Sequence, residues 1–184
     1  MNQMITTVVA RSKHLFYNCT AYFDKSGKQR EWYWVERPNN TKAVVIVATV
    51  EGKLVVTEEF RVPVQGKVWD LPAGLIDQNE IPENATVREL KEETGLDVVK
   101  FDRVTPFTFS SPGMTNESVC LAYVQASGEI STAGTEDSED IKVHLMSSSE
   151  VSKLIVEKLC GTGGEKVGAR AFFVFEHFAR HGFV

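Results

Sequence analysis

Three glutamates near the middle of the chain have a spacing that places their side chains on one face of a helix. Glu89, Glu92 and Glu93 stand at i, i+3 and i+4, and residues at these offsets are neighbours on a helix surface. Pro82 suits the first turn of such a helix, and Gly95 suits its left-handed end. The spacing therefore predicts a helix from Pro82 to Gly95 that carries a cluster of carboxylates.

Carboxylates this close repel one another, which destabilises a helix unless a positive charge offsets the repulsion. A hard cation such as Mg²⁺ binds carboxylate oxygens and keeps positions open for substrate phosphates. The alternative is a solvated charged face on which Arg88 pairs with Glu92 at i, i+4. Val87 and Leu90 are expected to dock the helix on a hydrophobic core.

The wider stretch from Gly74 to Leu96 fits the pattern G-x5-E-x7-R-E-U-x-E-E-x-G-U at every position, where U is apolar. At roughly one residue in fifteen per specified position, a chance match in this chain has a probability on the order of 10⁻⁷. The stretch resembles the Nudix box, the sequence signature of Nudix hydrolases. The matching residues are Gly74, Glu80, Arg88, Glu89, Leu90, Glu92, Glu93, Gly95 and Leu96.

This resemblance implies a reaction and a set of site residues. Nudix hydrolases cleave a nucleoside diphosphate linked to another moiety, by attack of water on phosphorus with Mg²⁺ or Mn²⁺ as the cofactor. The implied metal ligands are Glu89, Glu93 and the backbone carbonyl of Ala73, with Glu92 beside the metals as a catalytic residue. The implied structural residues are the ion pair of Glu80 and Arg88, Gly74 for a tight turn, and Gly95 for the helix exit.

Features outside the box resemble the ADP-ribose pyrophosphatase branch, which hydrolyses nucleoside diphosphate sugars. Pro112 stands sixteen residues beyond Leu96, as a proline does in this branch, and its loop makes Pro112 and Met114 candidate substrate-binding residues. Arg61 ends the segment Glu-Glu-Phe-Arg. The resemblance implies that this arginine binds the phosphates or the terminal ribose. A surface salt bridge is the alternative interpretation.

Trp32 lies in a segment similar to one whose tryptophan stacks on adenine in this branch, and Trp34 shares its strand face as the alternative stacking residue. The other interpretation of Trp32 is an aromatic residue of the core or of an interface. Stacking contributes roughly 1–3 kcal/mol per base and tolerates different bases. The substrate therefore stays open between ADP-ribose and another nucleotide sugar such as GDP-mannose. A nucleoside triphosphate or dinucleoside polyphosphate hydrolase and a non-catalytic nucleotide sensor are the further alternatives.

An acidic stretch precedes Ile141, where the branch places a loop that carries one metal ligand and the general base. Glu139 matches the extra metal ligand. Asp137 stands where some relatives have glutamate, so the catalytic base stays open among Glu136, Asp137 and Glu139. A solvated acidic loop is the alternative interpretation.

Composition limits the classes of protein that fit. The chain has 184 residues and a net charge of −5, which suits one domain with a small appendage and argues against a nucleic-acid or membrane-surface binder. No signal peptide or membrane span is expected. Cys19, Cys120 and Cys160 are too few and too scattered for a zinc site or a disulfide framework, which favours buried, reduced thiols and a cytoplasmic location.

The order of the elements predicts an α+β protein, in agreement with the Nudix fold of mixed β-sheets between α-helices. Residues 1–40 are expected to form N-terminal antiparallel strands, which the branch swaps across a homodimer, and residues 41–184 the Nudix domain. An antiparallel opening is expected over 6–37, with strands within 14–23 and 31–35. Further strands are expected within 43–50, 54–60, a short stretch that enters the box, 98–109, 117–124 and 141–146, with further helices at 151–160 and 167–180.

Overall fold

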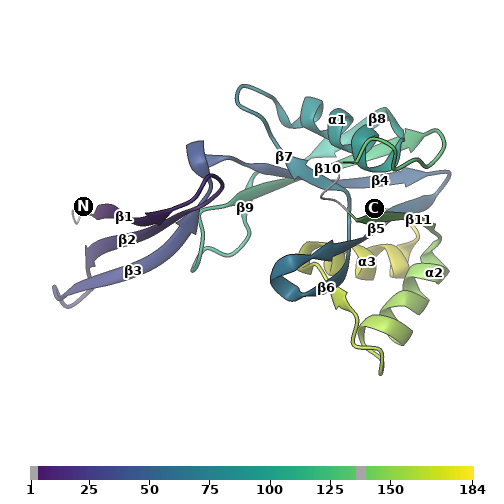
Figure 1. Ribbon diagram of the computed structural model, residues 1–184. Coiled ribbons are helices and arrows are strands. Elements are labelled where there is room, and N and C mark those ends of the chain that lie inside the picture. Colours follow the sequence, from purple (N-terminus) through teal and green to yellow (C-terminus); the bar gives the residue numbers. More distant parts are fainter. Residues whose placement is uncertain (1–3, 136–139) are drawn as a thin grey trace.

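A three-stranded antiparallel sheet projects from the rest of the chain in the computed structural model, which describes residues 4–135 and 140–184 (Figure 1). Its strands are β1 (Ile5–Arg11), β2 (Phe16–Phe23) and β3 (Gln29–Glu36). The carboxylate of Asp24 accepts the backbone N–H groups of Ser26 and Lys28 at 2.9 and 3.0 Å, so the side chain itself closes the turn between β2 and β3.

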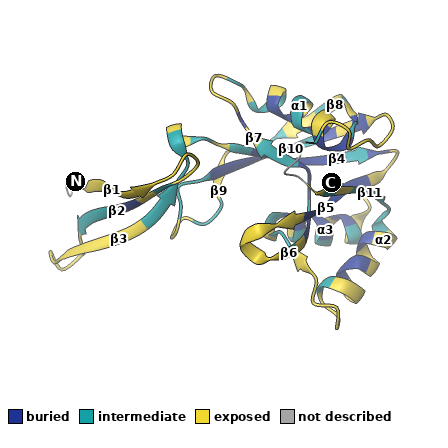
Figure 2. Cartoon of the chain, viewed as in Figure 1, coloured by how far each residue is buried: buried dark blue, intermediate teal, exposed yellow. Residues whose placement is uncertain are grey.

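We call β1–β3 the N-terminal arm. All of β1 and most of β3 are exposed (Figure 2). Several large apolar side chains on the arm are also exposed, and they are Ile5, Val8, Val9, Tyr17, Trp32 and Tyr33. These side chains lie on both faces of the arm, since neighbours such as Trp32 and Tyr33 point to opposite faces of β3. Exposed apolar surface of this kind is typical of a surface that contacts another molecule.

The main sheet consists of two halves that diverge from the turn between β4 (Ala43–Val50) and β5 (Lys53–Arg61). These two strands pair only next to the turn, through Thr49 with Leu54 and Val50 with Lys53. Beyond that point β4 pairs with β7 and β10, whereas β5 pairs with β6 and β11. The hairpin thus joins two diverging halves of one nine-stranded sheet.

The remaining strands are β6 (Gly66–Asp70), β7 (Ala73–Leu75), β8 (Asp97–Val104), β9 (Thr108–Phe109), β10 (Ser118–Ser127), β11 (Ile141–Met146) and β12 (Lys166–Val167). The helices are α1 (Pro82–Thr94), α2 (Ser148–Lys153), which continues as the π-helical η3 (Leu154–Leu159), and α3 (Ala169–His181). Short 3₁₀ turns are η1 (Pro38–Asn40) and η2 (Val62–Val64).

Helices cover both faces of the diverging sheet, with α1 on one side and α2 and α3 on the other (Figure 1). Alternate residues of β4 point to opposite faces: Val44 and Ile46 pack with Leu90 of α1, and Val45 and Val47 pack with Phe175 of α3. The layers confirm the predicted α+β fold with mixed strands between helices.

Most predicted elements are present, with a few differences. The expected helix at 151–160 begins earlier, at Ser148, because Ser147 and Glu150 form a reciprocal capping box. The short strand β12 was not predicted. No helix in the part of the chain that the structure describes is long and apolar enough to cross a membrane.

Two predictions about burial are wrong. Val87 is 47% exposed and does not dock α1; the buried stripe runs through Thr86, Leu90 and Thr94, and the hydroxyl groups of the two threonines donate to helix carbonyls of Pro82 and Leu90. Of the three free cysteines, only Cys120 is buried, whereas Cys19 is half-buried and Cys160 is exposed on the glycine-rich segment after η3.

Candidate active site

A cleft of about 810 Å³ lies where β4 and β5 are separated, at the ends of these strands away from their shared turn. The first residues of β4, the last residue of β5, the end of β6, strand β7 and one face of α1 line it. Its charged and box residues are Arg37, Arg61, Asp70, Ala73, Gly74, Asp77, Arg88, Glu89, Glu92, Glu93, Glu117 and Arg170. Segments far apart in the sequence therefore meet at one place.

Helix α1 has the ends that the sequence predicts. Pro82 occupies the first turn, and Gly95 adopts a left-handed φ of 75° while its N–H donates to the carbonyl of Lys91 at 2.9 Å. Glu89, Glu92 and Glu93 consequently share the face that lines the cleft. Their exposure is graded, because the side chains of Glu92 and Glu89 are 49% and 14% exposed and Glu93 is 5% exposed.

Arg88 pairs with several carboxylates on this face of α1 and in the loop before it. Its guanidinium donates to both oxygens of Glu80, at 3.2 and 2.9 Å, to the carbonyl of Leu75 at 3.0 Å, and to Glu89 at 2.7 Å. It also donates to Glu92 at 3.3 Å, which is the pairing weighed as the alternative to a metal. The hydrogen bonds from Arg88 lower the pKa of the Glu80 carboxyl. The structure thus contains the ion pair of Glu80 and Arg88 that the resemblance implied, and it ties the loop before α1 to the helix.

Strand β7 lies directly against the carboxylates of α1. The N–H of Ala73 donates to Oε2 of Glu93 at 3.1 Å. A Cβ placed on Gly74 would overlap the carboxyl group of Glu89. Gly74 lies in a strand and is not among the glycines with a positive φ, so its expected role in a tight turn is wrong. It is required because the carboxyl group of Glu89 fills the space beside it.

Only some of the acidic residues expected to bind metal lie within the part of the chain that the structure describes. Glu136, Asp137 and Glu139 lie outside them. Among residues 4–135 and 140–184, no three side chains of His, Cys, Asp or Glu converge closely enough to form a metal-ligating group. The donor chemistry of this face of α1 nevertheless fits a hard cation, because carboxylate oxygens from Glu89, Glu92 and Glu93 face one cleft beside the backbone of β7.

Three further arginines line the same cleft as the carboxylates. Arg61, which was predicted, forms an ion pair with Glu59 at 2.5 Å. Arg37 pairs with Glu117 at 3.0 Å. Arg170, in the first turn of α3, donates to the hydroxyl of Ser110 at 3.1 Å. These cations lie in the cleft where they can attract an anionic substrate.

Asp70, the last residue of β6, also lines the cleft. Burial raises the pKa of its carboxyl, while the N–H of Leu71, at 2.9 Å, and the charges of Arg170 and Arg61 act in the opposite direction. Sequence reasoning missed Asp70, Arg37 and Arg170. No local motif contains them, and only the pairing of distant strands and the docking of α3 bring them to the cleft.

Trp32, Trp34 and Pro112 lie together around a separate hollow of about 290 Å³ beside the arm. The indole N–H of Trp32 donates to the carbonyl of Gly113 at 3.0 Å, and the ring is 49% exposed. Met114 belongs to the same loop, and its carbonyl accepts the N–H of Val35 at 2.9 Å. The Met114 side chain is 61% exposed and lines neither this hollow nor the cleft.

Comparison with known proteins gives consistent matches. The family model described as NUDIX domain matches residues 39–159. The chain is similar to ADP-ribose pyrophosphatase of Saccharomyces cerevisiae, with 38% identity over 56% of this chain and 49% of that protein. It is also similar to putative nudix hydrolase 2 of Caenorhabditis elegans, with 35% identity over 72% of this chain and 61% of that protein. The chain thus spans half to three fifths of the length of these curated relatives.

A crystal structure of an ADP compounds hydrolase shares the fold of the whole chain. The match has a TM-score of 0.75 and covers 100% of this chain and 97% of that chain, at 22% sequence identity. The arm and the diverging sheet are therefore included in the common architecture.

Proposed function

Because this chain belongs to the NUDIX domain family, we propose that it is a divalent-metal-dependent pyrophosphatase. Its substrate is ADP-ribose or a related nucleoside diphosphate sugar, and its products are a nucleoside monophosphate and a sugar phosphate. The observation that carries the proposal is the cleft that the carboxylates of α1 share with arginines from three other segments. The name of the yeast relative supports the choice of substrate class.

The carboxylate wall would hold Mg²⁺ or Mn²⁺ through Glu89, Glu93 and the carbonyl of Ala73, with Glu139 as the additional ligand. A divalent cation supplies an activated water and neutralises charge that develops on the phosphoryl oxygens. The space beside Gly74 supports this assignment, since it lets the Glu89 carboxyl lie against the backbone of β7. Arg88 holds the wall together before substrate binds, because it contacts Glu80, Glu89 and Glu92.

The arginines of the cleft would bind the substrate's pyrophosphate. Arg61 and Arg170 would supply charge-assisted hydrogen bonds to phosphate oxygens and so orient the scissile bond. The nucleobase would stack on Trp32 in the hollow beside Pro112. Trp34 lines the same hollow and is the alternative stacking partner. Met114, exposed on the same loop as Pro112, is proposed as a further substrate contact.

The proton acceptor for the attacking water is proposed from the acids near the metals. Glu92 is the most exposed carboxylate of the α1 wall, which suits a group that exchanges protons with solvent. Glu136, Asp137 and Glu139 are the other candidates from the resemblance. Single replacements of these four acids, each with a pH–rate profile, would distinguish the base from the metal ligands.

The N-terminal arm supports a homodimer. Its exposed apolar residues, including Val8, Tyr17 and Tyr33, would be buried if the arm packed against a second copy. Such an arrangement matches the strand swap implied by the branch. Analytical ultracentrifugation tests it, and a monomer at micromolar concentration would exclude it. The free state of all three thiols supports a reducing compartment such as the cytoplasm.

The test of the activity is a substrate panel. Purified protein is incubated with ADP-ribose, ADP-glucose, GDP-mannose, ATP and a dinucleoside polyphosphate, each with Mg²⁺, with Mn²⁺ or with EDTA. We expect metal-dependent release of a nucleoside monophosphate from at least one nucleotide sugar and slower turnover of ATP. Release of no monophosphate from any nucleotide sugar would refute the proposal, whereas faster turnover of ATP would assign a different substrate class.

A further inference from the structure

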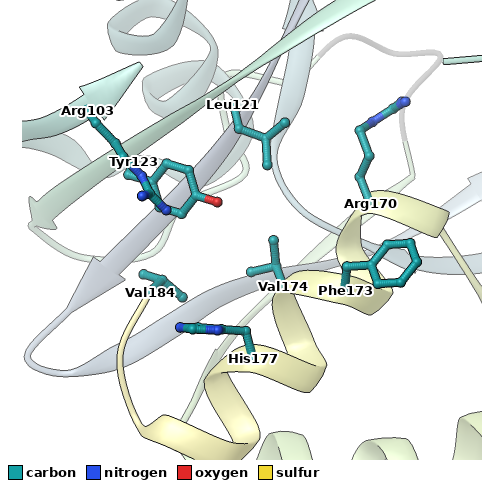
Figure 3. Close-up of a pocket in the computed structure, with 8 residues that line it drawn as sticks. All are labelled: Arg103, Leu121, Tyr123, Arg170, Phe173, Val174, His177 and Val184. Carbon is teal, nitrogen blue, oxygen red and sulfur yellow. The ribbon is translucent and has the colours of Figure 1, made fainter. Parts of the chain in front are cut away.

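A second hollow lies beside the catalytic cleft, between β8, β10 and α3. We call it the α3 pocket; it encloses about 330 Å³, and the lining residues that matter here are Arg103, Leu121, Tyr123, Arg170, Phe173 and Val174 (Figure 3). It shares no residue with the hollow of Trp32 and Pro112. It shares Arg170 with the catalytic cleft, so this arginine connects the two spaces.

The middle of the α3 pocket is apolar and its ends are cationic. Leu121 from β10 and Val174 from α3 point toward each other across the middle (Figure 3). Arg103 lies at one end, with its guanidinium carbon 3.9 Å from the centroid of the Tyr123 ring. Arg170 and Phe173 lie at the other end (Figure 3). The stacked pair of Arg103 and Tyr123 presents a flat surface on which another planar group can stack.

The charge of this pocket is not balanced by its own lining. None of its lining residues is Asp or Glu. Among the residues that the structure describes, no carboxylate forms an ion pair with Arg103. Arg170 donates to a neutral hydroxyl, and the carboxylate on which its charge acts is Asp70, which lines the catalytic cleft and not this pocket. By contrast, Arg37, Arg61 and Arg88 in the cleft all pair with glutamates. Two such cations around an apolar middle favour a planar ligand that carries an anion.

We propose that the α3 pocket binds a nucleoside monophosphate, with its base on the Arg103–Tyr123 surface and its phosphate on Arg170. The volume suits one nucleotide, since small-molecule sites start at roughly 300 Å³. A phosphate bound there would compete with the cleft for the guanidinium of Arg170. The occupied pocket therefore inhibits the enzyme, and the ligand is one of its own products. The identification of the ligand as a product rests on the proposed function; the binding site does not.

Calorimetry tests the site without turnover. AMP is titrated into the full chain, without added metal, in a Trp32→Ala background that removes stacking in the other hollow. We expect AMP to bind this variant and the affinity to fall about tenfold or more when Arg103→Ala is added. Arg103 is exposed and outside the catalytic cleft, so its loss should leave the thermal unfolding midpoint unchanged. Unaltered AMP affinity after Arg103→Ala, or no AMP binding in the Trp32→Ala background, would overturn the proposal.

A matched control lies on the same helix. Arg180 is exposed on α3, pairs with Glu176 at 2.7 Å and does not line the α3 pocket. Arg180→Ala removes the same charge and should leave AMP affinity unchanged. If Arg180→Ala lowers AMP affinity as much as Arg103→Ala does, the effect comes from net charge alone and the proposed contact is refuted. Inorganic phosphate and adenosine, titrated separately, should each bind more weakly than AMP. Equal binding of phosphate alone would show that the base makes no contact and would refute a nucleotide site.

The inhibition is tested on the active enzyme. AMP should slow hydrolysis by the wild-type chain, and Arg103→Ala should relieve this inhibition while kcat/KM without AMP stays the same. Undiminished inhibition in Arg103→Ala would place the inhibitory AMP in the catalytic cleft and contradict the feedback role. Absence of any hydrolysis would instead refute the proposed function, and the calorimetric result on the pocket would remain decisive.

Discussion

The carboxyl group of Glu89 occupies the space beside Gly74 that the Cβ of any other residue would fill. This contact joins strand β7 to helix α1 at the wall of the cleft. It explains why a glycine is needed in a strand, where the backbone itself does not require one. The same strand donates the N–H of Ala73 to Glu93, so β7 determines where two of the three carboxylates of α1 lie.

The first prediction follows from this contact. Gly74→Ala should displace the Glu89 carboxyl from the wall and lower kcat/KM by about 10²-fold, the cost of a misplacement of about 1 Å in an active site. Steady-state kinetics with ADP-ribose measures the effect. Gly113→Ala is the matched control, because the added methyl group meets no atom within 4 Å and the carbonyl that accepts from Trp32 is kept. Equal activity of the two variants would show that the Glu89 position does not matter.

The second prediction concerns Glu93, which is buried on the cleft face of α1. Glu93→Gln keeps an oxygen that can accept the N–H of Ala73 but removes the negative charge that a metal requires. We expect kcat/KM to fall by at least about 100-fold, while circular dichroism shows an unchanged fold. Glu83→Gln, in the first turn of the same helix and outside the cleft, should retain activity. Near-normal turnover in Glu93→Gln would remove Glu93 from the proposed metal ligands.

The helix at the centre of the site was predictable because its signals are local. Pro82 and Gly95 mark its ends, and the spacing of the glutamates fixes which of them share a face. The prediction failed for Val87, because apolar character alone did not identify the inward stripe. Thr86 and Thr94 lie in that stripe instead, since each satisfies its hydroxyl with a carbonyl of its own helix.

Most of the arginines in the cleft could not be predicted, because no local signal in the sequence places them there. Arg37 and Arg170 are separated by most of the chain, and each comes to the cleft through long-range packing: the former at the end of the arm, the latter on a helix docked by Phe175 and Phe178. The divergence of β4 from β5 after two paired positions also could not be predicted from the sequence. A hairpin signal specifies the turn and does not specify how far the strands stay paired.

The third prediction is a pH dependence that originates at Glu80. Hydrogen bonds from Arg88 and the N–H of Asp77 lower the pKa of this carboxyl below 4.5, its ordinary value. A group with a lowered pKa in the folded state stabilises the protein above its unfolded pKa, and this contribution is lost as pH falls through the folded pKa. Wild type should therefore be more stable than Glu80→Gln at pH 7, and the difference should shrink as the pH falls below 4.5.

Urea unfolding of both proteins between pH 7 and pH 3 measures this difference. Glu150 is the control, because its pKa is also lowered but its partners lie in the Ser147 cap, away from the cleft. Glu150→Gln should show a similar pH trend with no loss of activity. A difference between wild type and Glu80→Gln that stays constant down to pH 3 would mean that the ionised carboxylate does not contribute to stability.

The fourth prediction concerns base recognition by the arm. Trp32→Ala should raise KM for ADP-ribose about tenfold or more with a smaller effect on kcat, because stacking on a base contributes roughly 1–3 kcal/mol to binding. Trp32→Phe should recover most of the affinity, since it keeps an aromatic face. Tyr33 offers a matched control, because it is also 49% exposed but points to the opposite face of β3. If Tyr33→Ala raises KM as much as Trp32→Ala does, the effect belongs to the packing of the arm and not to stacking on the base.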